Sequence, residues 1–209
     1  MSKTSLPVPP LKWLRVTVNP NDVFINCPFD ESYDGFLYAI CFTILYCGFV
    51  PRSALESTDA GIVRIEKINS IIEQSNFGIH DLSFTHLDPH NQLPRFNMPF
   101  ELGLFLGCRR FGGKAHADKR TLIFVSQPYE YQQFISDIAG QDVHVHHGQP
   151  NHAVEELRDW LSNHDGTNPL PGHSRIWEAY QTFKRYAPLE KPTFRDYNYS
   201  VLEWLSHFR

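Results

Sequence analysis

Residues 60–84, AGIVRIEKINSIIEQSNFGIHDLSF, change their hydrophobic period partway along and thereby decide the fold class. In the first part isoleucines recur at positions 62, 65, 68 and 72 with charged residues between them, which predicts an amphipathic helix. The second part, Phe77–Phe84, is a short apolar run that predicts a strand. A helix followed directly by a strand is one step of a βαβ arrangement.

The same alternation continues on both sides of this stretch. Strands are expected at residues 22–29, 49–57, 77–84, 119–126 and 142–147. Helices are expected at residues 31–48, 60–75, 95–107, 129–140 and 151–164, with Gly48 as a glycine cap and Asn151 as a helix start. Strands that alternate with helices five times predict a parallel sheet covered on both faces.

The predicted fold class is therefore α/β. Right-handed crossovers lead to a three-layer, flavodoxin-like sandwich with a five-stranded parallel sheet in the order 2-1-3-4-5. Residues 1–20, with four prolines, are expected as an extended arm before the sandwich at residues 21–165. Residues 166–209 form a C-terminal helical extension, whose two aromatic-rich helices are expected to pack on the sandwich or on a second copy of the chain.

Composition excludes several broad classes. The chain has 209 residues, 42% of them hydrophobic, and a net charge of −4, so we expect a globular core and disfavour nucleic acid as a partner. No apolar run is long enough to span a membrane, and the N-terminus has no signal-peptide core, so a cytoplasmic protein is expected. A P-loop and a GxGxxG motif are both absent, which argues against a kinase or a Rossmann dehydrogenase.

Cysteines and histidines give no metal motif. The four cysteines form no CxxC pair and are expected as free, buried thiols. In His144–His147, alternation places His144 and His146 on one face of a strand, as in a possible ligand pair. No acid or cysteine motif accompanies them, so a half-exposed, histidine-rich edge strand is the preferred interpretation, and no metal is predicted.

A single acid interrupts the apolar run RFNMPFELGLFLG, Arg95–Gly107. This acid, Glu101, lies near the start of a predicted helix, with Pro99 in the first turn. In the predicted strand order the helix start faces the carboxyl ends of the first and third strands, where ligands bind in open parallel sheets. Glu101 is therefore either a catalytic carboxylate at this crevice or a capping-box residue that bonds to its own backbone.

Three motifs carry a resemblance to a known superfamily. DVFINCPFD (residues 22–30), HDLS (residues 80–83) and especially NMPFELGLFLG (residues 97–107) resemble the Toll/interleukin-receptor (TIR)-like proteins and the related nucleoside deoxyribosyltransferases. The resemblance implies that Glu101 attacks or stabilises the anomeric carbon of a ribosyl group. It also implies NAD or a related nucleotide as substrate with no separate cofactor, a homo-oligomer, an activating partner protein, and a setting in bacterial defence or signalling.

Other candidate substrate-binding residues lie beside the same crevice, each with a structural alternative. Asp81 could orient ribose hydroxyls or form a turn, and its neighbour Ser83 could bond to substrate or start that turn. Asn26 could bond to a ligand or hold its own loop, Phe29 could stack on a base or anchor the loop, and Asp30 could cap the next helix.

Two arginines are candidates for a phosphate clamp. A guanidinium group suits phosphate oxygens, and Arg52 lies in the second predicted strand while Arg64 lies on the predicted helix that follows it. Arg64 could instead pair with Asp59. These residues support an enzyme that cleaves N-glycosidic bonds as the first hypothesis, and a non-catalytic nucleotide-sensing or assembly module as the second.

Overall fold

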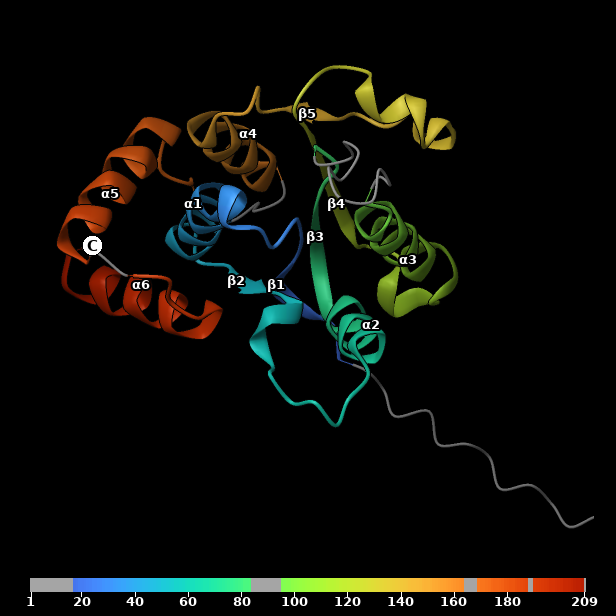
Figure 1. The fold of residues 1–209 in the computed structure, drawn as a ribbon, viewed down its shortest axis with the longest axis horizontal. Coiled ribbons are helices and arrows are strands. Elements are labelled where there is room, and N and C mark those ends of the chain that lie inside the picture. Colours follow the sequence, from blue (N-terminus) through green and yellow to red (C-terminus); the bar gives the residue numbers. More distant parts are fainter. Residues whose placement is uncertain (1–16, 84–94, 164–168, 188–189, 209) are drawn as a thin grey trace, which may run out of the picture.

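A computed structural model describes residues 17–83, 95–163, 169–187 and 190–208. One sheet of five parallel strands runs through the molecule in the order β2-β1-β3-β4-β5 (Figure 1), which confirms the predicted fold class and strand order. The strands are β1 (Asn19–Asn26), β2 (Val50–Arg52), β3 (Ser75–Asp81), β4 (Arg120–Val125) and β5 (His144–Val145).

Helices cover both faces of this sheet (Figure 1). On one face lie α1 (Asp34–Tyr46) and α4 (Pro150–Ser162), and on the other lie α2 (Arg64–Gln74) and α3 (Asn97–Phe111). Alternation along β4 explains how the sheet serves both layers, because Leu122 and Phe124 pack on the α1 side while Ile123 and Val125 pack on the α3 side. A strand that is apolar on both faces is typical of a parallel sheet.

The two C-terminal helices lie outside α1, where α5 packs against α1 and α4 and α6 packs against α1 (Figure 1). Apolar residues of α5 (His173–Tyr186) and α6 (Phe194–Phe208) belong to the same buried cluster as α1, α4 and the adjacent face of the sheet. Packing on the sandwich is therefore confirmed as the way their aromatic faces are buried. Residues 1–16 of the predicted arm lie outside the described residues, and Asn19 and Pro20 belong to β1.

Three predicted elements differ in detail. Residues 129–140 form two 3-10 turns, η4 (Glu130–Gln133) and η5 (Ser136–Ile138), so the predicted helix there is wrong. The expected strand at residues 49–57 is shortened to β2 by a further 3-10 turn, η2 (Ala54–Glu56). Helix α4 begins with Pro150 after Gln149, not at Asn151, and proline is favoured at this position because it has no N–H to leave unpaired.

The other short turns and the cysteines complete the framework. Turns η1 (Glu31–Tyr33) and η3 (Lys114–His116) precede α1 and β4. Cys27, Cys41 and Cys47 are buried thiols that form no disulfide, as predicted, whereas the thiol of Cys108, also outside any disulfide, is half-buried. Within the described ranges, no helix has the length and apolar character that crossing a membrane requires.

Candidate functional site

The carboxyl ends of β1 and β3 lie side by side, yet the chain leaves them in opposite directions. After Asn26 it turns towards α1 on one face, and after Asp81 it continues to α3 on the other face. Such a switch point is where open parallel sheets bind ligands, because the two departing connections separate there. The predicted candidates Asn26, Phe29, Asp30, Asp81, Ser83 and Glu101 all come from the segments that meet at this edge.

Glu101 lies in the second turn of α3, and its side chain is buried. Its side chain is 8% exposed, and it makes no hydrogen bond or ion pair with another described residue. The residue before the helix, Phe96, is the N-cap and has no side-chain capping bond, and the first turn of α3 contains no acid. The capping interpretation of Glu101 is therefore wrong, and its carboxylate remains available.

Burial changes the acidity of this carboxyl group. Removal from water raises the pKa of Glu101 to about 7, while the nearby positive charge of Arg64 opposes that rise. Burial raises the pKa of the Cys27 thiol most, and the charges of Asp81 and Glu101 raise it further. A carboxyl group with a pKa near neutrality and no structural partner is typical of a functional site.

Arg64 and Phe29 form the charged and aromatic side of the same region. Arg64 is the first residue of α2, and its guanidinium carbon lies 5.5 Å from the centre of the Phe29 ring. The Phe29 ring is 37% exposed, so it is only partly an anchor of the β1–α1 loop. Asp59 bonds to the backbone N–H of Gly61, and the described contacts include no ion pair between Asp59 and Arg64.

Asn26 holds the end of β1 against its neighbours. Its side-chain amide nitrogen lies 2.9 Å from Nδ1 of His80 and donates to the carbonyl oxygen of Met98 at 2.8 Å. Burial lowers the pKa of His80 to about 3, so the imidazole is neutral and Nδ1 accepts this hydrogen bond. Asn26 is 2% exposed, and this geometry favours the structural alternative, in which it fixes the start of α3 relative to the sheet.

Asp30 ties the β1–α1 loop to the residue that precedes α3. Both oxygens of its carboxylate accept from Arg95, one from Nη1 and the other from Nη2 at 3.2 Å. Asp30 occupies the N-cap position of η1, as predicted, but its side chain makes no capping bond because it is engaged with Arg95. The ion pair joins the loop that carries Phe29 to the segment just before the helix that carries Glu101.

Asp81 is completely buried and is fully engaged by the protein. It accepts hydrogen bonds from the Tyr33 hydroxyl and from the Ser83 N–H at 2.8 Å, and the latter closes the turn that the sequence offered as the alternative role. Burial alone would raise the pKa of Asp81, but hydrogen bonds from His146, Ser83 and Tyr33 keep it below its ordinary value. The geometry assigns Asp81 to the support of the site and leaves no exposed oxygen for ribose.

Ser83, His146 and Asp81 resemble a hydrolase triad in composition but not in geometry. Nε2 of His146 lies 2.7 Å from Ser83 Oγ and 3.3 Å from Asp81 Oδ2, and Nδ1 accepts the N–H of Gly148 at 3.1 Å. A backbone N–H bonds only to an unprotonated ring nitrogen, so the imidazole proton is on Nε2 and faces both oxygens. His146 therefore cannot accept the Ser83 proton, and the three side chains form a buried structural network.

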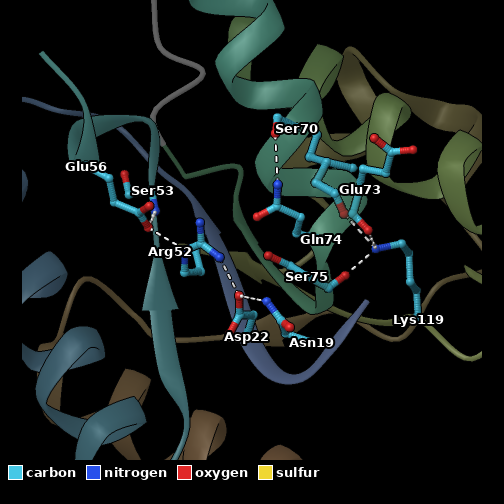
Figure 2. Close-up of polar contacts among 11 residues, drawn as sticks. Asn19, Asp22, Arg52, Ser53, Glu56, Ser70, Glu73, Gln74, Ser75 and Lys119 are labelled. Carbon is cyan, nitrogen blue, oxygen red and sulfur yellow. Dashed lines mark hydrogen bonds and ion pairs between the residues drawn. The ribbon is translucent and has the colours of Figure 1, made fainter. Parts of the chain in front are cut away.

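The side chain of Arg52 forms ion pairs with one residue of the adjacent strand β1 and one residue of η2. Figure 2 shows its guanidinium between Asp22 and Glu56, with Nη1 bonded to Asp22 and Nε bonded to Glu56 at 2.8 Å. The Glu56 carboxylate also accepts the N–H of Ser53, which completes a capping box around η2. These two ion pairs favour a structural role for Arg52, and Arg64 is the arginine whose charge acts on Glu101.

The histidine-rich segment is divided between two environments. His144, on the edge strand β5, is half-exposed, and its Nδ1 lies 2.6 Å from Glu156 of α4. His146 is buried in the network with Asp81, against the rings of Phe36 and Phe124. Within the described parts of the chain, no three His, Cys, Asp or Glu residues are grouped as metal ligands.

Sequence reasoning missed the partners of the site more than the site itself. No partner is predicted for His80 or Tyr33, and His146 is predicted only as a possible ligand together with His144 or as part of an edge strand. Their contacts join residues 48 to 63 positions apart in the chain, as in the Tyr33–Asp81 and Ser83–His146 pairs. One usable signal was a polar residue, His80, in the middle of a buried strand, since a buried polar group requires a partner.

Comparisons with known proteins do not add a family to these observations. No protein-family model and no curated protein matches this chain. The resemblance to TIR-like proteins and deoxyribosyltransferases therefore depends on the three motifs alone.

Proposed function

We propose that the chain cleaves the N-glycosidic bond of NAD or a related nucleotide or nucleoside, with Glu101 as the catalytic carboxylate. The observation that carries this proposal is a buried carboxyl group, without a hydrogen-bond or ion-pair partner among the described residues, on the helix that follows the switch point of a parallel sheet. Structural carboxylates in this region, such as Asp81 and Asp30, have protein partners. Glu101 differs from them because it makes no hydrogen bond or ion pair with another described residue.

The chemistry matches the position of this group. When the bond between ribose and base breaks, its electron pair leaves with the base and the sugar acquires oxocarbenium character. The Glu101 carboxylate stabilises that positive charge or bonds to the anomeric carbon, and water or another nucleoside then accepts the sugar. In a region of low polarity the attraction between the two charges is stronger than in water.

Phe29 and Arg64 supply the recognition that this reaction needs. The exposed part of the Phe29 ring offers a surface on which a base stacks. Arg64 can bond to a phosphate group, and a phosphate that draws Arg64 away from Glu101 would leave the carboxylate facing the sugar. The substrate is thus expected to carry both a base and a phosphate, as NAD does.

Ionisation of Glu101 gives the reaction a characteristic pH dependence. Because the pKa of Glu101 is raised to about 7, the active carboxylate form increases as the pH rises through this value. A positively charged nicotinamide ring beside the carboxylate would lower that pKa and favour the charged form. We expect the rate with NAD to rise with pH and to reach a plateau above neutrality.

The test is release of base by purified protein incubated with NAD, ATP and a set of nucleosides over a range of protein concentrations. Wild type should release base from at least one of these compounds, and Glu101→Gln should reduce the rate at least 100-fold. Glu203→Gln, a change of an exposed glutamate on α6, is the matched control and should retain the wild-type rate. The concentration series detects activity that requires a homo-oligomer.

The outcome that contradicts the proposal is equally defined. If NAD or another nucleotide binds, Glu101→Gln leaves binding unchanged, and no base is released at any concentration, the chain is a nucleotide sensor. Base release that continues in Glu101→Gln would show that another group performs the reaction.

A further inference from the structure

A second candidate binding region lies away from the switch point, between α1, α5 and α6. A cavity of about 510 Å³ opens there, a volume within the range of small-molecule sites. Aromatic rings from three different helices form most of its wall, and charged groups lie at its rim. The aromatic residues are Tyr38, Tyr180, Phe183 and Tyr197, and the charged ones are Lys184 and Glu190.

The aromatic wall is rigid and well supported from behind. Tyr38 and Tyr197 stack with ring centres 4.5 Å apart, and the Tyr197 hydroxyl donates to the carbonyl oxygen of Tyr38 at 2.8 Å. Phe183 packs edge-to-face on Tyr197, and Tyr180 packs on Phe42 of α1. Because these rings are held by one another, the cavity does not depend on a ligand for its shape.

One polar group of the wall has no hydrogen-bond partner among the described residues. Tyr180 as a whole is only 2% exposed, but its hydroxyl is not one of the fully buried unpaired polar atoms, so it keeps contact with the space of the cavity. Water in the cavity can bond to this hydroxyl, and a ligand that displaces this water must offer an acceptor in its place. A ligand with a nitrogen or oxygen acceptor on a flat ring would satisfy this hydroxyl while its ring lies against the aromatic wall.

We propose that this cavity binds a planar heteroaromatic small molecule of about the size of a nucleobase or nucleoside. Aromatic walls favour flat rings through stacking and edge-to-face contacts, and the Tyr180 hydroxyl selects rings with a polar atom. The site is separate from Glu101, and its occupation does not depend on the proposed reaction.

The position of the cavity also connects it to the switch point. A smaller cavity of about 200 Å³ shares Tyr38 and Pro192 with it and is lined on its other side by Phe29. Phe29 is the ring over which Arg64 lies. The two cavities are therefore neighbours, and the smaller one reaches the loop that carries Phe29.

Binding is tested on the full chain with adenine, adenosine and indole as probes and cyclohexanol as a non-aromatic control. NMR of protein with ¹³C-labelled tyrosine reports on the cavity, and titration calorimetry gives the affinity. At least one aromatic probe should shift the tyrosine ring signals on saturable binding, and cyclohexanol should not. If none of the three aromatic probes binds at millimolar concentration, the proposal is overturned.

Gly35 provides a variant that fills the cavity without disturbing its frame. It lines the cavity in the first turn of α1, and an added Cβ would meet no atom within 4 Å. Gly35→Leu should weaken binding of the aromatic probe at least tenfold. Gly103→Leu places the same side chain at another open glycine, in α3, and should leave the affinity unchanged.

Two further variants separate this site from the proposed reaction. Tyr180→Phe removes only the unpaired hydroxyl and should weaken adenine or indole binding by about 3- to 10-fold. Glu101→Gln should bind the probe as wild type does. Binding that resists Gly35→Leu but is lost in Glu101→Gln would place the probe at the switch point and would refute the second site.

Discussion

At the scale of single residues, Glu101 is a carboxyl group in a position that does not favour its charge. Burial raises its pKa to about 7, so the folded chain favours the protonated form. Unlike Asp81, which receives hydrogen bonds from three residues, Glu101 has none from the described residues to offset the loss of water. Retaining a charged group there therefore lowers stability, as is common at sites that serve a function.

This argument predicts the effect of Glu101→Gln on stability. A raised pKa in the folded state means that ionisation opposes folding, and the penalty grows as the pH rises from the unfolded value near 4.5 through about 7. At a pH of about 8.5 the free energy of unfolding of Glu101→Gln should exceed that of wild type by about 1–2 kcal/mol, reduced from the full value by solvent contact.

Urea denaturation of both proteins between pH values of about 5 and 8.5 measures this difference. The gap should shrink steadily towards the acidic end, where the protonated fraction of Glu101 increases. If the difference in the free energy of unfolding stays constant with pH, the surroundings of Glu101 do not shift its pKa.

The sequence predicts some of these residues and not others for a definite reason. Glu101 can be identified from the sequence because it is the one acidic residue in the apolar run Arg95–Gly107. Whether it caps its helix depends on where α3 begins, and helix ends are the least certain part of a sequence-based assignment. The partners of Asp81 come from η1 and the end of β5, so only the folded chain identifies them.

At the scale of elements, the residues at the C-terminal end of α1 explain why this helix ends where it does. Gly48 follows α1 with φ = 86°, and the N–H groups of Gly48 and Phe49 bond to the carbonyl oxygens of Leu45 and Ile44, both at 3.0 Å. This is the Schellman arrangement, in which a left-handed residue satisfies the last carbonyl groups of a helix. The glycine cap was predictable because only glycine adopts this conformation without strain.

A pair of glycines in the same region gives a matched prediction. Gly48→Ala should lower the free energy of unfolding by about 1 kcal/mol, because alanine is strained at a positive φ. Gly35→Ala, within α1 and free of close contacts, should raise it by about 0.5–1 kcal/mol through helix propensity. Thermal and urea denaturation measure both changes, and a stabilising effect of Gly48→Ala would contradict the role of the cap.

The end of α2 uses a buried lysine instead of a glycine. The Lys119 ammonium group donates to the carbonyl oxygens of Ile72 at 2.6 Å, Glu73 at 3.4 Å and Ser75, as Figure 2 shows. These carbonyl groups lie where α2 ends and β3 begins, and a cation is favoured there by the helix dipole. Lys119 is 0% exposed, so the contact is not replaceable by water.

Removal of this cation should therefore be costly. Lys119→Met should lower the free energy of unfolding by about 2–4 kcal/mol, because it leaves buried carbonyl groups without donors. Lys114→Met, an exposed lysine of η3, is the control and should change stability by less than about 0.5 kcal/mol. Equal effects of the two substitutions would argue against the capping role of Lys119.

Residues 129–140 show where element prediction fails. Tyr131, Phe134, Ile135 and Ile138 have helical spacing, and all of them pack against β4 or α3. At Tyr129, however, φ is 65°, and at Ile135 the backbone again lies outside helical geometry. Two short 3-10 turns therefore pack these side chains, in place of one helix. Spacing alone cannot distinguish the two outcomes, since short helices gain most of their stability from tertiary contacts.

At the scale of the whole molecule, the C-terminal helices complete the core of the sandwich. Phe42 of α1 is the centre of this contact, with ring centres 5.4 Å from Tyr180, 5.6 Å from Phe183 and 5.9 Å from Trp204. The sequence predicted the two helices and their need for burial, but it left open whether the surface they cover belongs to this chain or to a second copy. The answer depends on the surface that α1 and α4 form together in the folded chain, and a local sequence pattern does not describe that surface.

A shared core predicts that the molecule unfolds as one unit. Trp204 is 7% exposed and packs against α1 and α5, so Trp204→Ala should lower the free energy of unfolding by about 3–5 kcal/mol. Tyr199→Ala, at a 77% exposed position of the same helix, should change it by less than about 0.5 kcal/mol. Circular dichroism and tryptophan fluorescence should follow one coincident transition in wild type and in both variants. If Trp204→Ala shifted only a first, separate transition while the sheet melted as in wild type, α5 and α6 would be an independent domain, and the cavity between them and α1 would be an interface between two domains.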